Sequence, residues 1–252
     1  MSFDVAADSY DAFMGRYSVL LSPQLADFAG VVPGQYVLDV GCGPGALTAE
    51  LARRVGPERV TAVDPEERFV AAARSRNPGA TVSRASAERL PFDARTFEAS
   101  LAQLVVHFMT DPVAGLAEMA RVTRRGGTVA ACVWDYAGDR APLSVFWRVA
   151  HEMDAAVTDE SELPGARKGS LSKLFSAAGL RDVEERLISA SVTHASFEEW
   201  WEPYTRRVGP AGVYVAGLDP ERRNELRERC RRALGDAPFE VRFSAWAARG
   251  SA

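Results

Sequence analysis

A glycine-rich turn between a strand-like and a helix-like segment constrains the fold of this 252-residue chain more than any other feature. Residues 37–45 read Val-Leu-Asp-Val-Gly-Cys-Gly-Pro-Gly, where an apolar run typical of a buried parallel strand leads into three glycines at alternate positions. Residues 46–55 follow with apolar side chains at helical spacing. Glycine permits positive φ angles and close approach of a ligand to the backbone, so this pattern predicts the first half of a βαβ unit.

A second strand-like segment, residues 59–64, ends in an acid that follows Gly41 by 23 residues. A carboxylate at this place can accept hydrogen bonds from both hydroxyls of an adenosine ribose. We therefore predict that Asp64 binds an adenosine-containing cofactor. Its alternative role is to cap the helix that begins at Pro65, and the two roles are compatible.

The kind of cofactor depends on the residues around the turn. Gly41, Gly43 and Ala46 match a dinucleotide fingerprint weakly. In a dinucleotide site, the Asp39 carboxylate would be repelled by the negatively charged pyrophosphate. In an S-adenosylmethionine site, it would attract the positively charged ammonium and sulfonium groups. Together with the third glycine, Gly45, this acid indicates S-adenosylmethionine.

These residues resemble the class I S-adenosylmethionine-dependent methyltransferases, in particular the type 11 group that acts on small molecules. Residues 86–92 resemble the adenine-side loop of that family, residues 96–103 its fourth strand, and residues 117–127 its helix and turn before strand five. The resemblance is specific over about residues 30–135. It implies methyl transfer from S-adenosylmethionine to oxygen, nitrogen or carbon of a small-molecule acceptor. An NAD(P)-dependent oxidoreductase and a non-catalytic S-adenosylmethionine-binding module remain as alternatives.

Strands that alternate with helices predict an α/β fold with a doubly wound parallel sheet. In the resembling family this is a seven-stranded, Rossmann-like sheet whose last strand is antiparallel and inserts between strands five and six. We expect a single methyltransferase domain with an N-terminal helical lid (1–30), a cofactor-binding core (31–135), and cap helices with the C-terminal strands (136–252). The expected strands are 36–41, 60–64, 81–85, 97–102, 128–134, 182–192 and 239–248, and the expected later helices are 142–157, 171–178, 196–208 and 220–234.

Composition excludes several classes of protein. A net charge of −4 gives no reason to expect nucleic-acid binding. The three cysteines, Cys42, Cys132 and Cys230, are odd in number and widely spaced, so no disulfide framework or zinc site is expected. The N-terminus lacks the basic and apolar regions of a signal peptide, and no apolar run reaches the ~20 residues of a membrane helix. We expect a cytosolic protein without a metal.

The resemblance also implies which residues contact the cofactor. Ser86 departs from the family, where an aspartate usually accepts a hydrogen bond from the adenine amine; a serine hydroxyl would accept it more weakly, and Ser86→Asp is expected not to weaken binding. Arg16, with Tyr10 and Tyr17, lies in the lid segment and is expected at the methionine end. The full predicted set is Arg16, Asp39, Gly41, Cys42, Gly43, Gly45, Asp64, Phe69, Ser86, Ala87, Glu88 and Gln103.

Catalysis and acceptor binding are predicted from histidines and aromatic residues. Histidine has an unperturbed pKa suited to a general base, and His107 follows strand four, where the resembling family often has a histidine near the methyl; its alternative role is to hydrogen-bond the neighbouring loop. His151 and His194 are weaker candidates. Aromatic residues outside the cofactor motifs are expected to line an acceptor pocket under the cap, for an aromatic or isoprenoid-like acceptor: Trp134, Tyr136, Phe146, Trp147, Trp200 and Tyr204.

Overall fold

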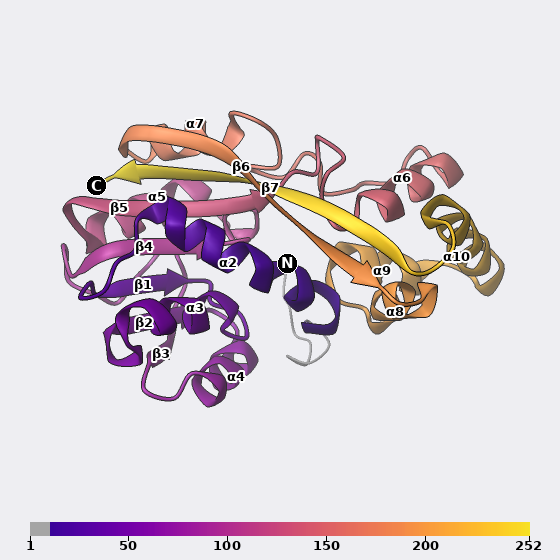
Figure 1. Cartoon of the computed structure of the whole chain (residues 1–252). Coiled ribbons are helices and arrows are strands. Elements are labelled where there is room, and N and C mark those ends of the chain that lie inside the picture. The colour runs from indigo at the N-terminus through magenta and orange to yellow at the C-terminus, as the bar shows by residue number, and fades with distance from the viewer. Residues whose placement is uncertain (1–10) are drawn as a thin grey trace.

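The computed structural model describes residues 11–252 and has a seven-stranded sheet at its centre (Figure 1). The strand order is β3-β2-β1-β4-β5-β7-β6, and β7 is antiparallel to both of its neighbours. This confirms the predicted sheet and the insertion of the last strand between strands five and six. The strands are β1 (Val37–Val40), β2 (Val60–Asp64), β3 (Thr81–Arg84), β4 (Phe97–Gln103), β5 (Thr123–Trp134), β6 (Arg181–His194) and β7 (Phe239–Ser251).

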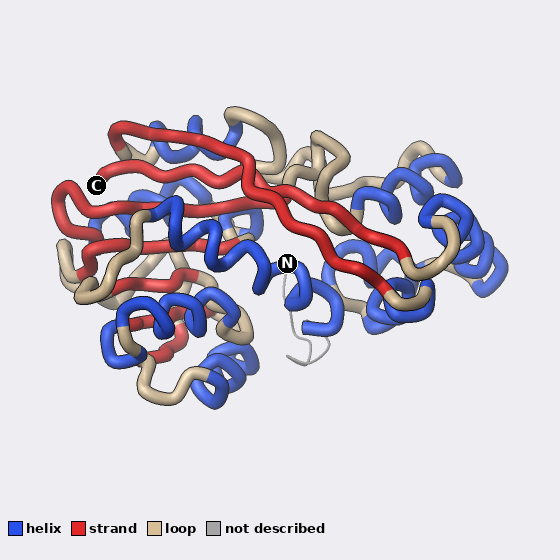
Figure 2. The backbone as a smooth tube through the Cα atoms, viewed as in Figure 1, coloured by secondary structure: helices blue, strands red, loops and turns tan. Residues whose placement is uncertain are grey.

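Helices cover both faces of this sheet (Figure 2). One face packs against α2 (Arg16–Ala29), α3 (Ala46–Val55) and α4 (Glu67–Arg76), and the other against α5 (Pro112–Val122) and α7 (Ser170–Ala177). All four residues of β1 are buried, because a parallel strand in a doubly wound sheet has helices on both sides. A turn of π-helix, η1 (Asp11–Gly15), precedes α2, and short 3₁₀ turns are η2 (Pro57–Arg59) and η3 (Val106–Phe108).

The remaining helices form a second lobe at one end of the sheet (Figure 1). This cap lobe consists of α6 (Ser144–Met153), α8 (Phe197–Trp201), η4 (Glu202–Arg206), α9 (Gly209–Gly217) and α10 (Pro220–Leu234). The helix predicted over 196–208 is divided into α8 and η4, and α9 was not predicted. Its short, glycine-containing sequence has little helical propensity, so α9 depends on packing within the lobe.

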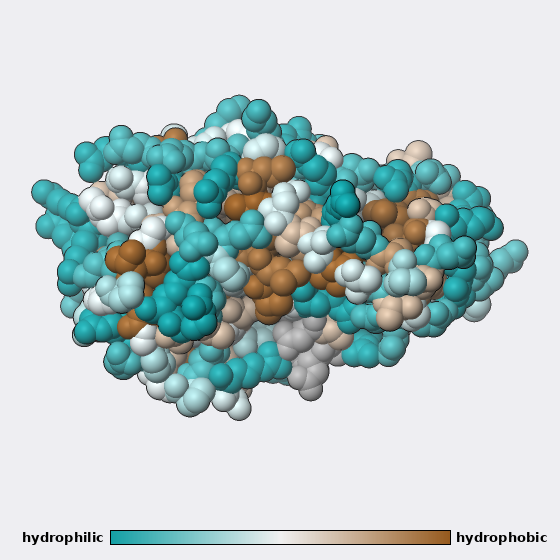
Figure 3. Space-filling view, viewed as in Figure 1, coloured by the Kyte–Doolittle hydropathy of each residue, from teal (hydrophilic) through white to brown (hydrophobic). Residues whose placement is uncertain are grey.

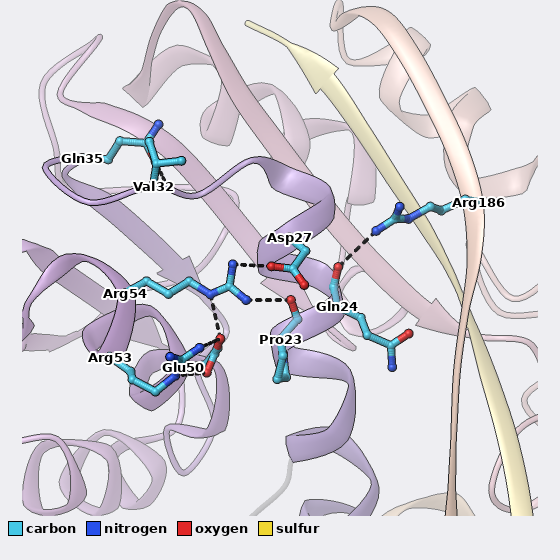
Figure 4. A network of polar contacts seen from close by, with 9 residues as sticks. All are labelled: Pro23, Gln24, Asp27, Val32, Gln35, Glu50, Arg53, Arg54 and Arg186. Carbon is cyan, nitrogen blue, oxygen red and sulfur yellow. Dashed lines mark hydrogen bonds and ion pairs between the residues drawn. The ribbon is translucent and has the colours of Figure 1, made fainter.

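A polar network holds α2 against α3 and against the edge of the sheet (Figure 4). The Arg54 guanidinium donates to Asp27 at 2.6 Å, to Glu50 at 2.7 Å and to the Pro23 carbonyl at 2.9 Å. Arg186 of β6 donates to the Gln24 carbonyl at 3.3 Å. Helix α2 is therefore tied to the core along its second half, although Pro23 interrupts its backbone hydrogen bonding.

The visible surface is mostly hydrophilic, with apolar areas in the middle of the view, where Figure 1 draws the N-terminal half of α2 (Figure 3). Val19 and Leu20 of that helix are 48% and 40% exposed. Within residues 11–252, no helix is both long and apolar enough to cross a membrane.

Candidate cofactor site

A cavity of about 300 Å³ lies where β1, β2 and β4 end. Ligands bind in doubly wound sheets at this carboxyl edge. Most of the predicted cofactor residues line the cavity: Asp39, Gly41, Cys42, Gly43, Asp64, Phe69, Ser86, Ala87, Glu88 and Gln103. Gly45 and Arg16 do not. Residues that the sequence analysis missed complete the wall: Ser18, Pro44, Ala46, Leu47, Pro65, Glu66, Leu104, Val105, Phe108, Met109 and Thr110.

The three glycines of the turn have different structural roles. All have positive φ, at 71° for Gly41, 52° for Gly43 and 100° for Gly45. A Cβ on Gly43 would meet nothing within 4 Å, so this glycine leaves space beside the cavity. A Cβ on Gly41 would lie 2.5 Å from Val105, and one on Gly45 would lie 2.3 Å from Asn77. Gly45 is thus required for packing against α4 and not as part of the cavity wall.

Asp64 ends β2 and is held by the two loops beside it. Its two carboxylate oxygens accept the backbone N–H groups of Gly43 and Glu66, each at 2.9 Å. Burial is the main cause that raises the pKa of Asp64 to about 6. The N-cap residue of α4 is Glu66 and not Asp64, so the alternative role of Asp64 as the helix cap does not hold.

Asp39 is almost fully buried and only half satisfied. Thr48 Oγ1 donates to its Oδ2 at 2.6 Å, while its Oδ1 has no hydrogen-bond partner in the described part of the chain. Burial and, to a smaller extent, the nearby Asp64 carboxylate together raise the pKa of Asp39 to about 7. A buried carboxylate oxygen without a partner is satisfied best by a cation or a strong donor. The cavity therefore suits a ligand that brings a positive charge to Asp39.

Comparison with known proteins identifies the family. A family model described as "Methyltransferase domain" matches residues 38–131. The ubiquinone/menaquinone biosynthesis C-methyltransferase of Cupriavidus metallidurans is 32% identical over 183 residues, which are 65% of this chain and 74% of that protein. The chain belongs to the S-adenosylmethionine-dependent methyltransferases. Its cofactor is S-adenosylmethionine, and it is an enzyme that methylates a small molecule. These assignments exclude the alternatives of an oxidoreductase and a non-catalytic module.

Two further comparisons extend the match beyond the family model. An uncharacterized protein of Mycobacterium tuberculosis is 28% identical over 235 residues, which are 88% of this chain and 84% of that protein. A solved structure from Bacillus halodurans, provisionally named a methyltransferase, has a TM-score of 0.60 and 20% identity. It covers 91% of this chain and 97% of its own, so its likeness in fold extends well beyond residues 38–131.

Ser86 and Glu88, which line the cavity, form a hydrogen-bonded pair that was not predicted from the sequence. The Ser86 hydroxyl donates to Glu88 Oε2. The other oxygen of Glu88 accepts the backbone N–H of Thr110 at 2.8 Å, and that of Asp111 at 3.4 Å. Hydrogen bonds from Ser86 and these backbone groups outweigh burial and hold the pKa of Glu88 below its usual range. Glu88 is therefore an ionised anchor between two loops of the cavity wall.

Arg16 lies away from this cavity. Its guanidinium donates to Glu199 at 2.9 Å and is 3.2 Å from Nδ1 of His194, while the Tyr17 hydroxyl is 3.0 Å from His194 Nε2. These contacts join α2 to the end of β6 and to α8, so the structure does not support Arg16 as a cofactor residue. The related expectation for Tyr10 lies outside the described residues.

The prediction that His107 acts as general base is not supported. His107 lies in η3 but does not line the cavity, and its ring is buried beside Phe108 at a centroid distance of 3.9 Å. Burial lowers the pKa of His107 to about 3, and no described residue bonds its Nδ1. Nε2 of His151, in α6, lies 3.1 Å from a carboxylate oxygen of Asp159 in the loop after that helix. His194 forms a hydrogen bond with Tyr17 of α2. Each of these three histidines is therefore outside the described cavity wall.

The aromatic acceptor pocket stays a prediction, because the predicted aromatic residues lie apart from this cavity. Two of them, Trp200 and Tyr204, line a separate small pocket together with Phe13 and Arg16. None of Trp134, Tyr136, Phe146, Trp147, Trp200 and Tyr204 lines the cavity within residues 11–252. They belong to, or pack against, one hydrophobic core cluster that continues from the sheet into the cap lobe. Phe146 stacks on Tyr204 with centroids 4.6 Å apart, and Trp200 lies 4.7 Å from the same ring. Aromatic rings bury so much apolar area that they serve first as the core of this lobe.

Proposed function

We propose that the cavity holds S-adenosylmethionine with its ribose at Asp64, its adenine along residues 86–88 and its methionine part beside Asp39. The observation that carries this arrangement is Oδ1 of Asp39, which is buried and unpartnered among the described residues. Gly43 supports this arrangement. It lines the cavity and has free space where a side chain would stand, so a ligand can approach its backbone closely. When bound, the cofactor supplies a methyl group on a sulfonium, which is already activated for displacement.

We propose further that the acceptor is apolar. Leu104, Val105, Phe108 and Met109 give the cavity an apolar side opposite in character to its carboxylates. The related enzyme of Cupriavidus metallidurans, by its name, acts in ubiquinone/menaquinone biosynthesis. The net charge of −4 supports an acceptor other than a nucleic acid. The buried, unpaired thiols of Cys42, Cys132 and Cys230 support a cytosolic location.

The contribution of the protein to catalysis is alignment and exclusion of water. Holding two reactants in line contributes about 7–11 kcal/mol to lowering a barrier, and the proton that the acceptor loses on methylation is released to solvent. Asp39 and Asp64 orient one reactant, and the apolar wall confines the other. With His107 buried elsewhere, we propose that no histidine of the described chain removes a proton from the acceptor.

Product formation with a panel of acceptors tests this function. The full-length protein is incubated with S-adenosylmethionine and either apolar hydroxyarenes or polar compounds such as sugars and oligonucleotides, and release of S-adenosylhomocysteine is measured. We expect turnover with members of the apolar group alone. Turnover confined to the sugars or oligonucleotides would contradict the proposed acceptor class, and calorimetric binding of NAD in place of S-adenosylhomocysteine would contradict the cofactor arrangement.

Cofactor binding is expected to depend on pH through Asp39. Its pKa is raised to about 7 in the folded, ligand-free protein, so folding favours the protonated form. Stability of the ligand-free protein should therefore fall as the pH rises from about 4 to 7, where the folded state binds more protons than the unfolded state. Binding of a positively charged ammonium requires the carboxylate, so affinity for S-adenosylhomocysteine should rise over the upper part of this window. Calorimetric titrations from pH 5.5 to 8 measure this rise.

The control for this pH dependence is Asp39→Asn, which removes the titrating group and keeps the size of the side chain. Its affinity should be lower and should lose the rise near pH 7, while Asp64, whose pKa is raised to about 6, still titrates at the lower end of the range. Glu160, whose pKa burial raises to about 7, affects stability in the same direction, but it lies outside the cavity. An unchanged pH profile in Asp39→Asn would show that another group controls binding.

The Ser86–Glu88 pair leads us to revise the expectation for Ser86→Asp. An aspartate cannot donate to Glu88 and would place two carboxylates side by side, which is unfavourable. We expect a loss of about 1–2 kcal/mol in binding of S-adenosylhomocysteine, the scale of a lost hydrogen bond to a charged group. The double variant Ser86→Asp/Glu88→Gln restores a donor and removes the repulsion, so it should regain most of the affinity. Wild-type affinity in Ser86→Asp would support the original expectation instead.

A further inference from the structure

The side-chain amide of Gln103 uses its nitrogen in a hydrogen bond, whereas its oxygen has no partner among the described residues. Its Nε2 donates to the backbone carbonyl of Ser18 in α2 at 3.1 Å. A carbonyl can only accept, so this bond fixes which end of the amide is nitrogen. Oε1 is buried and has no hydrogen-bond partner among residues 11–252. Both Gln103 and Ser18 line the cavity.

An unpartnered buried acceptor calls for a ligand that donates an N–H or O–H. The cavity has two such atoms, Oδ1 of Asp39 and Oε1 of Gln103, which lie at the ends of the neighbouring strands β1 and β4. A cation is stabilised more by a carboxylate than by a neutral amide. The ammonium group of the cofactor therefore suits Asp39, and Gln103 is left for a neutral donor.

The residues that follow Gln103 indicate what carries that donor. Leu104 and Val105 come next in the chain, and Phe108 and Met109 lie one short turn later on the same wall. This surface suits an apolar body, whereas a charged amine would lose its hydration there without gaining a counter-ion. An ionised oxygen would face the lone pairs of Oε1 and be repelled.

We propose that Gln103 Oε1 accepts a hydrogen bond from a neutral hydroxyl group of the methyl acceptor, so that the acceptor is an apolar ring compound with a free hydroxyl, such as a phenol or hydroquinone. This assignment rests on the proposed function. Gln103 is then a specificity-determining residue, and Ser18 positions it. Because the same amide bonds α2, the first turn of that helix takes part in selecting the acceptor.

Binding to the complex with S-adenosylhomocysteine tests this assignment without turnover. The probes are 1,4-naphthohydroquinone, kept reduced under anaerobic conditions, and its dimethyl ether, which has the same ring without a donor. The wild-type complex should bind the hydroquinone about 3- to 30-fold more tightly than the ether, the range for one hydrogen bond to a buried group. Gln103→Met should abolish this preference when both probes are titrated into protein saturated with S-adenosylhomocysteine. Gln35→Leu, an exchange in the turn before β1, should keep the preference.

Three results separate the possibilities. Equal binding of the hydroquinone and its ether by the wild-type complex would overturn the inference. A tenfold or larger loss of S-adenosylhomocysteine affinity in Gln103→Met, with the preference between probes retained, would also overturn it and assign Oε1 to the cofactor. Failure of the wild-type protein to bind S-adenosylhomocysteine at all would instead overturn the proposed function.

Discussion

Replacing Asp64 with alanine is expected to weaken binding of S-adenosylhomocysteine by about 1–3 kcal/mol, roughly 5- to 150-fold in affinity. The carboxylate lines the cavity, and its removal also leaves the N–H groups of Gly43 and Glu66 without their acceptor. The variant would therefore lose the contact between residue 64 and the ligand, and also the hydrogen bonds that hold the glycine turn in place. Isothermal titration calorimetry measures the affinity, and thermal unfolding measures the effect on the turn.

The matched control is Asp64→Asn, which keeps the size of the side chain and one acceptor oxygen but loses the charge. We expect it to fall between wild type and Asp64→Ala in affinity. If Asp64→Ala binds S-adenosylhomocysteine as tightly as wild type, Asp64 is not the ribose contact, and its role is limited to holding the turn.

Gly45→Ala is expected mainly to lower the stability of the protein, and Gly43→Ala mainly to weaken binding of the cofactor. Gly45→Ala forces a side chain onto a residue with φ of 100° and places its Cβ 2.3 Å from Asn77 and 3.3 Å from the backbone of Ala73. We expect a loss of about 1–3 kcal/mol in the free energy of unfolding, or a fall in Tm of roughly 2–12 °C. Differential scanning calorimetry of the ligand-free protein measures this loss.

Gly43→Ala has open space for its Cβ, so only the positive φ of 52° costs stability, by about 1 kcal/mol. Its methyl group stands beside the cavity, and we expect a loss of S-adenosylhomocysteine affinity of tenfold or more, about 1.4 kcal/mol. Gly34→Ala is the control for backbone strain alone, since its φ is 94°, its Cβ meets nothing within 4 Å, and it lies outside the cavity wall. Equal affinities for the variants at 34 and 43 would argue against close approach of the ligand to Gly43.

The cofactor site could be predicted because its residues belong to short motifs with a fixed spacing in the sequence. The glycine turn after β1 and the acid at the end of β2 are fixed by spacing, and parallel strands bring their carboxyl ends to one edge. The position of the antiparallel β7 was likewise confirmed, through the family resemblance. The different roles of Gly43 and Gly45 were not visible, since they depend on where α4 packs.

The acceptor half was not predictable from residue type. Trp200 and Tyr204 have the composition of a ligand pocket, but apolar rings also make a hydrophobic core, and only the packing of α6 against α8 and η4 decides between the two. The role predicted for His107 also depended on packing, because its position after β4 does not determine whether η3 turns the imidazole ring toward the cavity or into the core. Gln103 and Glu88 could be placed at the site, yet their partners Ser18 and Thr110 lie far away in sequence.

The register in which β5 pairs with β7 has a structural consequence for the cap lobe. Pairing of β5 with β7 stops at Trp134 and Ala245, and beyond that point β6 and β7 continue alone as a two-stranded ribbon to His194 and Phe239. Six residues of β7 extend about 20 Å from that point, and the far end of the ribbon leads into α8 to α10. The buried side chains of Val241 and Phe243 pack this ribbon into the core cluster, and Tyr17 and Arg16 hold its far end through His194 and Glu199. The start of α2 therefore fixes the cap lobe relative to the sheet, so the same helix borders the cofactor cavity through Ser18 and anchors the lobe through the two residues before it.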